Sequence, residues 1–197
     1  KVGIIGAGTM GGGIAMNFAN AGIAVVIVEQ KQEPLDRGMA TIRKNYERTA
    51  SRGGITAEQV ETRCGLITGS LSMEDSFADV DLVIEAVFER MDIKKDIFAK
   101  LDAICKPGAI LASNTSSIPI ARLAEMVAPA RRPLVVGMHF FSPVPVMPLI
   151  ELVRAASTSD ATEAAVRAYA VELGKQVIVS RDRPGFIVNR ILMPYLA

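Results

Sequence analysis

Residues 1–30 read KVGIIGAGTMGGGIAMNFANAGIAVVIVEQ, and this stretch decides the fold. An apolar run, Val2 to Ile5, predicts a strand, and a glycine-rich turn and a helix-patterned stretch to Ala21 follow it. A second apolar run, from Ala24 to Val28, predicts another strand that ends on Glu29. Strand, turn, helix and strand in this order predict the first unit of a doubly wound α/β fold of the Rossmann type.

The glycines of the turn meet the physical demands of holding a dinucleotide. Gly6 permits the tight turn, Gly8 lets the backbone approach a pyrophosphate, and Gly11 lets the helix pack closely on the strand. Glu29 lies 23 residues after Gly6, near the roughly 20-residue spacing of an acid that binds the adenosine ribose hydroxyls. A carboxylate there repels a 2′-phosphate, so the stretch predicts NAD rather than NADP; the alternative is a purely structural unit.

Composition narrows the class of partner. The 197 residues include 22 basic and 21 acidic side chains, without a long run of either sign. This balance favours a small-molecule substrate over nucleic acid or a membrane surface. Cys64 and Cys105 lack the spacing of a metal site, and the chain has one histidine, so no metal is expected.

The cysteines and the first residues lead to expectations about location. We interpret both cysteines as reduced thiols, and no signal sequence or apolar stretch of membrane-spanning length is visible. These features predict a cytoplasmic protein, with the mitochondrial matrix or the peroxisome as alternatives. Because the chain begins with Lys1 at the edge of a strand, we expect an excised or processed piece.

Strands and helices alternate along the rest of the chain. Pro34 begins a long amphipathic helix that runs to Gly53, and Thr56 with Gln59 resembles a capping box. We interpret the basic face of the long helix as solvated; the alternative is contact with an anionic substrate tail. The pattern predicts a mostly parallel sheet with further strands at 66–68, 81–86, 109–113, 134–140, 149–153 and 176–180, and further helices at 91–105 and 160–173.

Ligands of such sheets bind at the carboxyl ends of the strands, and polar clusters fall there. Glu89 and Lys94 follow the strand at 81–86. One interpretation is that they contact a ligand. The other is that Glu89 compensates the dipole of the next helix and that Lys94 is its partner on the surface. Asn114 to Ser117 follow the strand at 109–113. Ser117 is interpreted as an ordinary helix N-cap, and the run as a whole predicts polar groups beside a nicotinamide.

His139, the single histidine, ends the strand at 134–140, and Glu151 interrupts an apolar run twelve residues later. A buried carboxylate needs a partner, and an imidazole suits it because the carboxylate fixes the tautomer and frees the other ring nitrogen to accept a proton. Such a pair beside NAD can remove the proton from a secondary alcohol while the hydride leaves. The sequence predicts metal-free alcohol dehydrogenation; taken by itself, a histidine flanked by apolar residues is more often a satisfied core residue than a catalyst.

With these residues assembled, the chain resembles the NAD-binding domain of the L-3-hydroxyacyl-CoA dehydrogenase family. The motifs that carry the resemblance are GAGTMGGGIA, DLVIEAVFE, SNTSS, HFFSPVPVMPLIELV and DRPGFIVNRIL, in this order. The resemblance implies that His139 is the base, Glu151 its orienting acid, Ser116 a contact of substrate and nicotinamide, and Asn189 a substrate-positioning group. The NAD contacts that it implies are Gly6, Gly8, Thr9, Met10, Gly11, Glu29, Glu89, Lys94, Asn114, Ser116 and Ser142.

The resemblance also implies an activity and a domain organisation. The activity is reversible oxidation of an L-3-hydroxyacyl-CoA thioester to 3-ketoacyl-CoA, in fatty-acid β-oxidation or butanoate-type metabolism. Residues 1–184 are then the NAD-binding domain, and residues 185–197 are the first helix of a truncated helical domain that forms a homodimer.

The chain departs from the family pattern at a few positions. Glu29 replaces a common Asp with retention of charge, and Ser142 replaces a common Asn near the nicotinamide. The nearest equivalents of the CoA-binding residues, Asn45 and Arg52, match poorly. A gulonate-type 3-dehydrogenase acting on a free sugar acid and a non-catalytic NAD-binding relative stay as alternatives.

Overall fold

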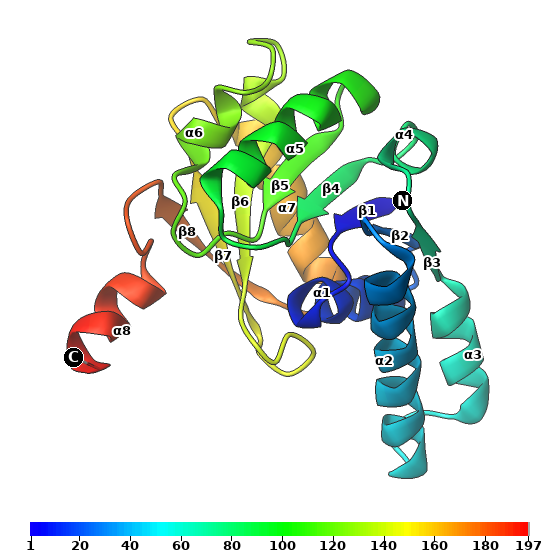
Figure 1. Cartoon of the computed structure of the whole chain (residues 1–197). Coiled ribbons are helices and arrows are strands. Elements are labelled where there is room, and N and C mark those ends of the chain that lie inside the picture. Colours follow the sequence, from blue (N-terminus) through cyan, green and yellow to red (C-terminus); the bar gives the residue numbers. More distant parts are fainter. Residues whose placement is uncertain (197) are drawn as a thin grey trace.

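Helices cover both faces of an eight-stranded sheet in the computed structural model, which describes residues 1–196 (Figure 1). The first half of the chain contains β1 (Val2–Ile5), α1 (Thr9–Asn20), β2 (Val25–Val28), α2 (Gln32–Ser51), α3 (Ala57–Gly65), β3 (Ile67–Ser70) and α4 (Met73–Ser76). The second half contains β4 (Leu82–Glu85), α5 (Met91–Ile104), β5 (Ile110–Ser113), α6 (Ile120–Ala124), a 3-10 turn (Arg132–Leu134), β6 (Val135–Phe140), β7 (Leu149–Arg154), α7 (Asp160–Glu172), β8 (Gln176–Arg181) and α8 (Val188–Leu196).

The strand order is β3-β2-β1-β4-β5-β6-β7-β8, which confirms the predicted doubly wound sheet. β1 pairs in parallel with β2 on one side and with β4 on the other. The chain therefore leaves β1 in one direction and returns beside it at β4. In open α/β sheets, ligands bind at such a switch point, outside the carboxyl ends of the strands. The glycine turn after β1 lies at this point.

Alternate residues of each strand pack into two apolar layers. Ile4 and Ile27 belong to the layer that includes residues of α1, α2 and α7. Ile5 and Val28 belong to the other layer, with residues of α4, α5 and α6. Figure 1 shows α5 and α6 in front of the sheet and α7 behind it. Because both faces are covered, the central strands are apolar almost without interruption, as expected for a parallel sheet.

The last two strands of the sheet, β7 and β8, run opposite to the other six. β7 is antiparallel to β6, whereas all other neighbouring strands are parallel. The connection at residues 141–148 is shorter than the stretch of about a dozen residues that a parallel crossover requires, so the chain turns straight back. This reversal places the end of β6 opposite the beginning of β7.

Some local predictions were wrong in detail. The long helix begins at Gln32 rather than Pro34, which lies in its first turn, where proline is tolerated. α4 and α6 were missed because four or five residues are too few to show a helical period. The predicted capping box at Thr56 and Gln59 is confirmed. Within residues 1–196, no helix combines the length and the apolar character needed to cross a membrane.

Candidate active site

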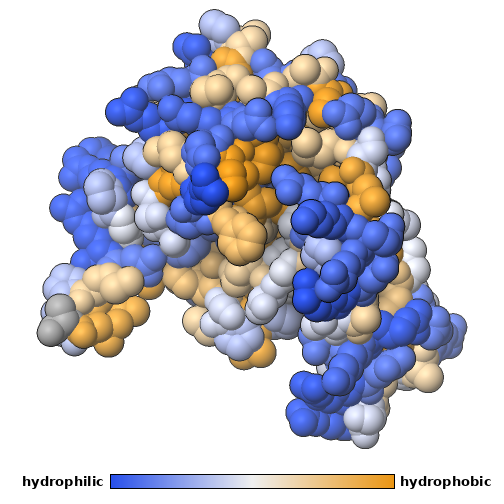
Figure 2. Space-filling model, in the orientation of Figure 1, coloured by the Kyte–Doolittle hydropathy of each residue, from blue (hydrophilic) through white to orange (hydrophobic). Residues whose placement is uncertain are grey.

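A cleft of about 1330 Å³ lies over the switch point of the sheet. Its lining includes the glycine turn after β1, Glu29 at the end of β2, Val87 and Phe88 after β4, and Ser142 after β6. Figure 2 shows apolar side chains gathered in the middle of this face, with hydrophilic ones around them. Phe88 is 83% exposed and adds to this apolar surface.

The glycine turn has the shape that a dinucleotide requires. Gly6 has a φ of +104°, which side-chain-bearing residues rarely adopt. A Cβ on Gly11 would lie 1.9 Å from the carbonyl oxygen of Gly6, so α1 packs on the turn without room for a methyl group. A Cβ on Gly8 would meet no atom within 4 Å. Gly8 therefore borders open space at the start of α1, whose first N–H groups can bind phosphate.

Glu29 lies at the tip of β2 and is tied to the glycine turn. Its carboxylate accepts hydrogen bonds from the backbone N–H of Ala7 over 3.0 Å and from that of Gln30 over 2.9 Å. Thr9 and Met10 open α1 beside it and line the same cleft. The predicted phosphate-binding and ribose-binding residues thus lie together, and the residues present fit a dinucleotide.

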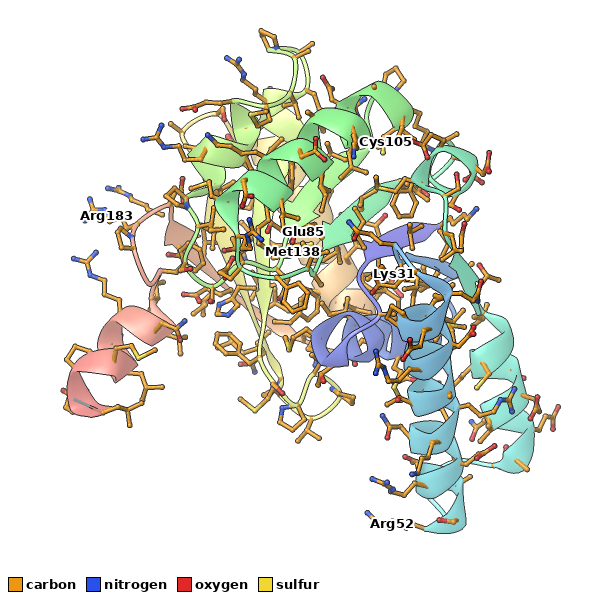
Figure 3. The ribbon with its side chains drawn as sticks, viewed as in Figure 1. Lys31, Arg52, Glu85, Cys105, Met138 and Arg183 are labelled. Carbon is orange, nitrogen blue, oxygen red and sulfur yellow. The ribbon has the colours of Figure 1, made fainter. Side chains whose placement is uncertain are left out.

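A buried ionic network lies at the carboxyl end of β4. Glu85 is fully buried and pairs with the ammonium group of Lys94, which is 1% exposed. The other carboxylate oxygen of Glu85 accepts a hydrogen bond from the Ser113 hydroxyl over 2.5 Å. The alternative that Lys94 lies on the surface beside Glu89 was wrong as to the surface, because Lys94 is buried between α5 and the sheet; its ammonium group does lie near Glu89. In Figure 3, Glu85 lies near the middle of the molecule.

Sequence reasoning missed Glu85 as a member of this region. The signal was present, because an acid inside the apolar run LVIE needs a partner in the same way as Glu151 does.

Glu89 links this network to the turn after β5. Its carboxylate accepts hydrogen bonds from the Thr115 hydroxyl over 2.6 Å and from the backbone N–H and hydroxyl of Ser116 over 2.9 and 3.1 Å. The Lys94 ammonium lies 3.6 Å away. Burial raises the pKa of Glu89, but these hydrogen bonds and the Lys94 charge outweigh it and leave the pKa below its ordinary value of 4.5. Glu89 thus holds Ser116 in place as an ionised acceptor.

The pKa of Glu89 predicts how its stabilising effect depends on pH. A carboxyl group with a lowered pKa in the folded state stabilises the fold above the ordinary pKa and loses this effect as the pH falls through the lowered value. The parent is therefore expected to exceed the Glu89→Gln variant in free energy of unfolding, by less than about 1 kcal/mol because the side chain is partly exposed.

The measurement is chemical denaturation of both proteins across a pH series. The difference should be constant from neutral pH to about pH 5 and should shrink below 4.5. A difference that persists undiminished in acid would contradict this assignment.

The turn after β5 contains one correction. The interpretation of Ser117 as a helix N-cap was wrong, because α6 begins only at Ile120 and the carboxylate of Asp182 accepts from its first N–H groups over 2.8 Å. Asn114 lies between the candidate groups: its side-chain oxygen accepts from the backbone N–H of Phe140 over 2.8 Å. This bond joins the end of β5 to the residue that follows His139.

His139 and Glu151 are direct cross-strand partners in the antiparallel pair of β6 and β7. Side chains of opposed residues lie on the same face of a sheet, and here His139 Nδ1 lies 3.0 Å from Glu151 Oε1. His139 is 7% exposed and Glu151 is fully buried. The predicted pairing of the buried carboxylate with the single histidine is therefore present, although the strand reversal that creates it was not predicted.

Glu151 is positioned as an ionised acceptor. Burial raises its pKa, but hydrogen bonds from His139 and from the backbone N–H groups of Ile187 and Val188 outweigh it, so the pKa lies below its ordinary value of 4.5. An ionised carboxylate has no proton to donate, so His139 Nδ1 must be the donor. The Nε2 atom of the neutral ring is then an unprotonated acceptor, which is the form that a general base needs.

The remaining predicted residues lie at different places relative to the cleft. Ser142 follows β6 and lines the cleft, and Asn189 is half-buried in the first turn of α8. Asn45 lines the cleft from α2, whereas Arg52 follows the last turn of that helix (Figure 3). Arg52 is therefore remote from the candidate site, as its poor match to the family pattern suggests.

Comparison with known proteins gives consistent matches. A family model described as "3-hydroxyacyl-CoA dehydrogenase, NAD binding domain" matches residues 1–183. A probable 3-hydroxybutyryl-CoA dehydrogenase of Deinococcus radiodurans is 49% identical over 196 residues, covering 100% of this chain and 69% of that protein. The fatty acid oxidation complex subunit alpha of Idiomarina loihiensis is 45% identical over 196 residues, covering 99% of this chain and 27% of that protein.

Solved structures share the same fold. The crystal structure of (S)-3-hydroxybutyryl-CoA dehydrogenase from Ralstonia eutropha is similar with a TM-score of 0.94 and 44% sequence identity. The similarity covers 99% of this chain and 68% of that one. The chain thus spans about two thirds of the single-function relatives and about a quarter of the longer subunit.

Proposed function

The chain belongs to the 3-hydroxyacyl-CoA dehydrogenase family, and from this premise we propose that it catalyses reversible oxidation of L-3-hydroxyacyl-CoA to 3-ketoacyl-CoA with NAD. The observation that carries the proposal is the buried pair of His139 and Glu151 at the same sheet edge as the glycine-turn cleft. We base the proposal of an acyl-CoA substrate on the names of the relatives, which are 3-hydroxybutyryl-CoA dehydrogenases.

We assign the proton transfer to His139. Its Nε2 atom takes the proton of the substrate's 3-hydroxyl group, and Glu151 stabilises the imidazolium that forms, through the hydrogen bond to Nδ1. Bound NAD supplies the acceptor for the hydride that leaves C3. Ser116 and Asn189 are proposed to hold the substrate oxygen as it becomes a carbonyl.

We divide the proposed cofactor-binding residues into two groups; in the second group, Ser142 is the residue that lines the cleft. We assign the phosphates to the glycine turn, with Gly6, Gly8 and Gly11 shaping it, and the adenosine ribose to Glu29. We assign the nicotinamide end of the cofactor to the polar residues that follow β4, β5 and β6. These are Glu89, Lys94, Asn114, Ser116 and Ser142.

The end of the chain supports the proposed division at residue 185. α8 projects away from the sheet (Figure 1), and its apolar side chains are largely exposed, between 46% for Leu192 and 83% for Tyr195. A helix with such a surface requires a covering partner. We propose that residues 185–197 begin a helical unit through which the longer protein forms a homodimer. Cys64 and Cys105 are both free. The cytoplasm stays the proposed location, with the mitochondrial matrix or the peroxisome as alternatives.

The experiment that tests the function is NADH oxidation at varied acetoacetyl-CoA, with the full-length protein that carries this chain. Free gulonate with NAD is the parallel assay. Rapid oxidation that depends on acetoacetyl-CoA is the expected result. Firm NADH binding without turnover of the thioester would overturn the proposal; turnover of gulonate would then indicate the sugar-acid enzyme, and no turnover of either a binding protein.

A further inference from the structure

The turn at residues 183–188, which leads into α8, holds the carboxylate of Glu151. The backbone N–H of Ile187 donates to Glu151 Oε2 over 2.6 Å, and that of Val188 donates to the same atom over 3.2 Å. Glu151 Oε1 is the atom that meets His139. One oxygen of the carboxylate is thus held by the turn and the other by the imidazole. The turn therefore fixes the rotation of the carboxylate about the Cγ–Cδ bond of Glu151.

The same turn also contacts the imidazole. The ring of Phe186 lies 6.0 Å from the His139 ring, centroid to centroid, at an interplanar angle of 63°. Phe141, which follows β6, lies on the ring at 4.5 Å. His139 is therefore flanked by two aromatic rings, one from its own strand end and one from the turn before α8.

Phe186 adopts a backbone conformation that its side chain disfavours. Its φ is +52°, and it is the one non-glycine residue with a positive φ within residues 1–196. This conformation is strained for a bulky residue and persists where packing demands it. Phe186 is 3% exposed and packs into the apolar layer on the α5 and α6 face of the sheet. The turn is thus an ordered element.

The start of the turn is anchored independently of α8. The carboxylate of Asp182 accepts from the backbone N–H groups of Ile120 and Ala121, which fixes the chain to the N-terminus of α6. Phe186 N–H then donates to the carbonyl of Arg183 over 2.9 Å and closes the turn. Figure 3 shows Arg183 where the chain leaves the sheet for α8. The turn is therefore built on the sheet domain before the exposed helix begins.

We propose that residues 183–188 form a positioning element of the proposed base: their amides aim the Glu151 carboxylate at His139, and Phe186 restricts the rotation of the imidazole. The expected loss of turnover rests on the proposed function. The expected change in the orientation of the imidazole does not. The turn at the end of the NAD-binding domain then determines the orientation of the His139 imidazole.

The test exploits the fact that His139 is the single histidine of the chain. Val188→Pro deletes one N–H that donates to Glu151, at the first helical position, where proline is favoured. Val188→Ala keeps that N–H and removes the same side chain. The ¹⁵N shifts of the one imidazole report its tautomer, and we expect the proline variant to show more Nε2–H tautomer than the alanine variant. Turnover of acetoacetyl-CoA should fall about tenfold between the two, with an unchanged KM for NADH.

Phe186→Ala provides a second variant, because it changes the ring contact and leaves every backbone amide in place. It should alter the imidazole ¹⁵N shifts and lower kcat with the KM for NADH unchanged. Parent-like ¹⁵N shifts in both Val188→Pro and Phe186→Ala would overturn the proposal, and so would altered shifts with parent-like kcat. If the parent protein shows no thioester turnover, the proposed function fails, whereas altered imidazole ¹⁵N shifts in both variants would still support the positioning element.

Discussion

Replacing His139 with glutamine is expected to lower kcat with acetoacetyl-CoA and NADH by about 10³-fold, the usual contribution of a positioned proton donor or acceptor. The glutamine amide cannot exchange a proton with the substrate oxygen at neutral pH. NADH affinity should be nearly unchanged, because His139 does not line the glycine-turn cleft. Stopped-flow turnover and fluorescence titration of NADH provide the two readouts. A parent-like kcat, or a loss of NADH affinity in place of kcat, would refute the assignment.

Glu151→Gln gives an independent check on the same pair. The amides of Ile187 and Val188 require an acceptor, so the glutamine carbonyl oxygen should face them. Its NH₂ group then faces His139 Nδ1 as a donor and stabilises the tautomer with the proton on Nε2. We expect kcat to fall about a hundredfold or more, because the ring is then held in a form that cannot accept the substrate proton.

Replacing Gly11 with alanine is expected to destabilise the protein by about 3 kcal/mol, since the new methyl group would overlap the backbone rather than a movable side chain. The Cβ would lie 1.9 Å from the carbonyl oxygen of Gly6, so α1 must move relative to β1. NADH binding should be lost together with stability, because the turn and the helix start are one unit. Thermal unfolding and NADH titration measure both effects.

Gly8→Ala is the matched control for this variant. The φ of Gly8 is −75°, which suits alanine, and a Cβ at this position would meet no atom within 4 Å. We expect the free energy of unfolding to change by less than about 1 kcal/mol, while NADH affinity falls at least about tenfold because the methyl group stands where a pyrophosphate would approach. Parent-like NADH binding by Gly8→Ala would show that the phosphates do not lie on this turn.

The fold was predictable from the sequence wherever a strong local pattern coincided with buried layers. The strand, glycine turn, helix and acid of residues 1–30 could be predicted because each has a steric or electrostatic requirement that few residue types meet. The reversed direction of β7 was not predicted, although the short connection at 141–148 requires it. The short helices α4 and α6 depend on capping by Ser72 and Asp182, which periodicity does not reveal.

The candidate site was predictable in part. His139 and Glu151 could be paired because a buried acid requires a partner and the chain has one histidine. The family resemblance, which the comparisons confirm, added Asn189 and Ser116, whose types alone indicate nothing specific. The contacts of Glu151 with the amides before α8 could not be predicted, because any residue supplies an N–H and only the folded path of the chain brings those two to the carboxylate.

In the proposed mechanism, the antiparallel pairing of His139 with Glu151 links turnover to the correct register of β7. A slip of β7 by one residue would turn Glu151 to the opposite face of the sheet and break the pair entirely. Molecules misfolded in this way would show no turnover, although the half of the sheet with the glycine turn would still bind cofactor. In a library screen, cofactor binding and turnover measured together would therefore separate variants with damaged chemistry or strand register from those that fail to fold at all.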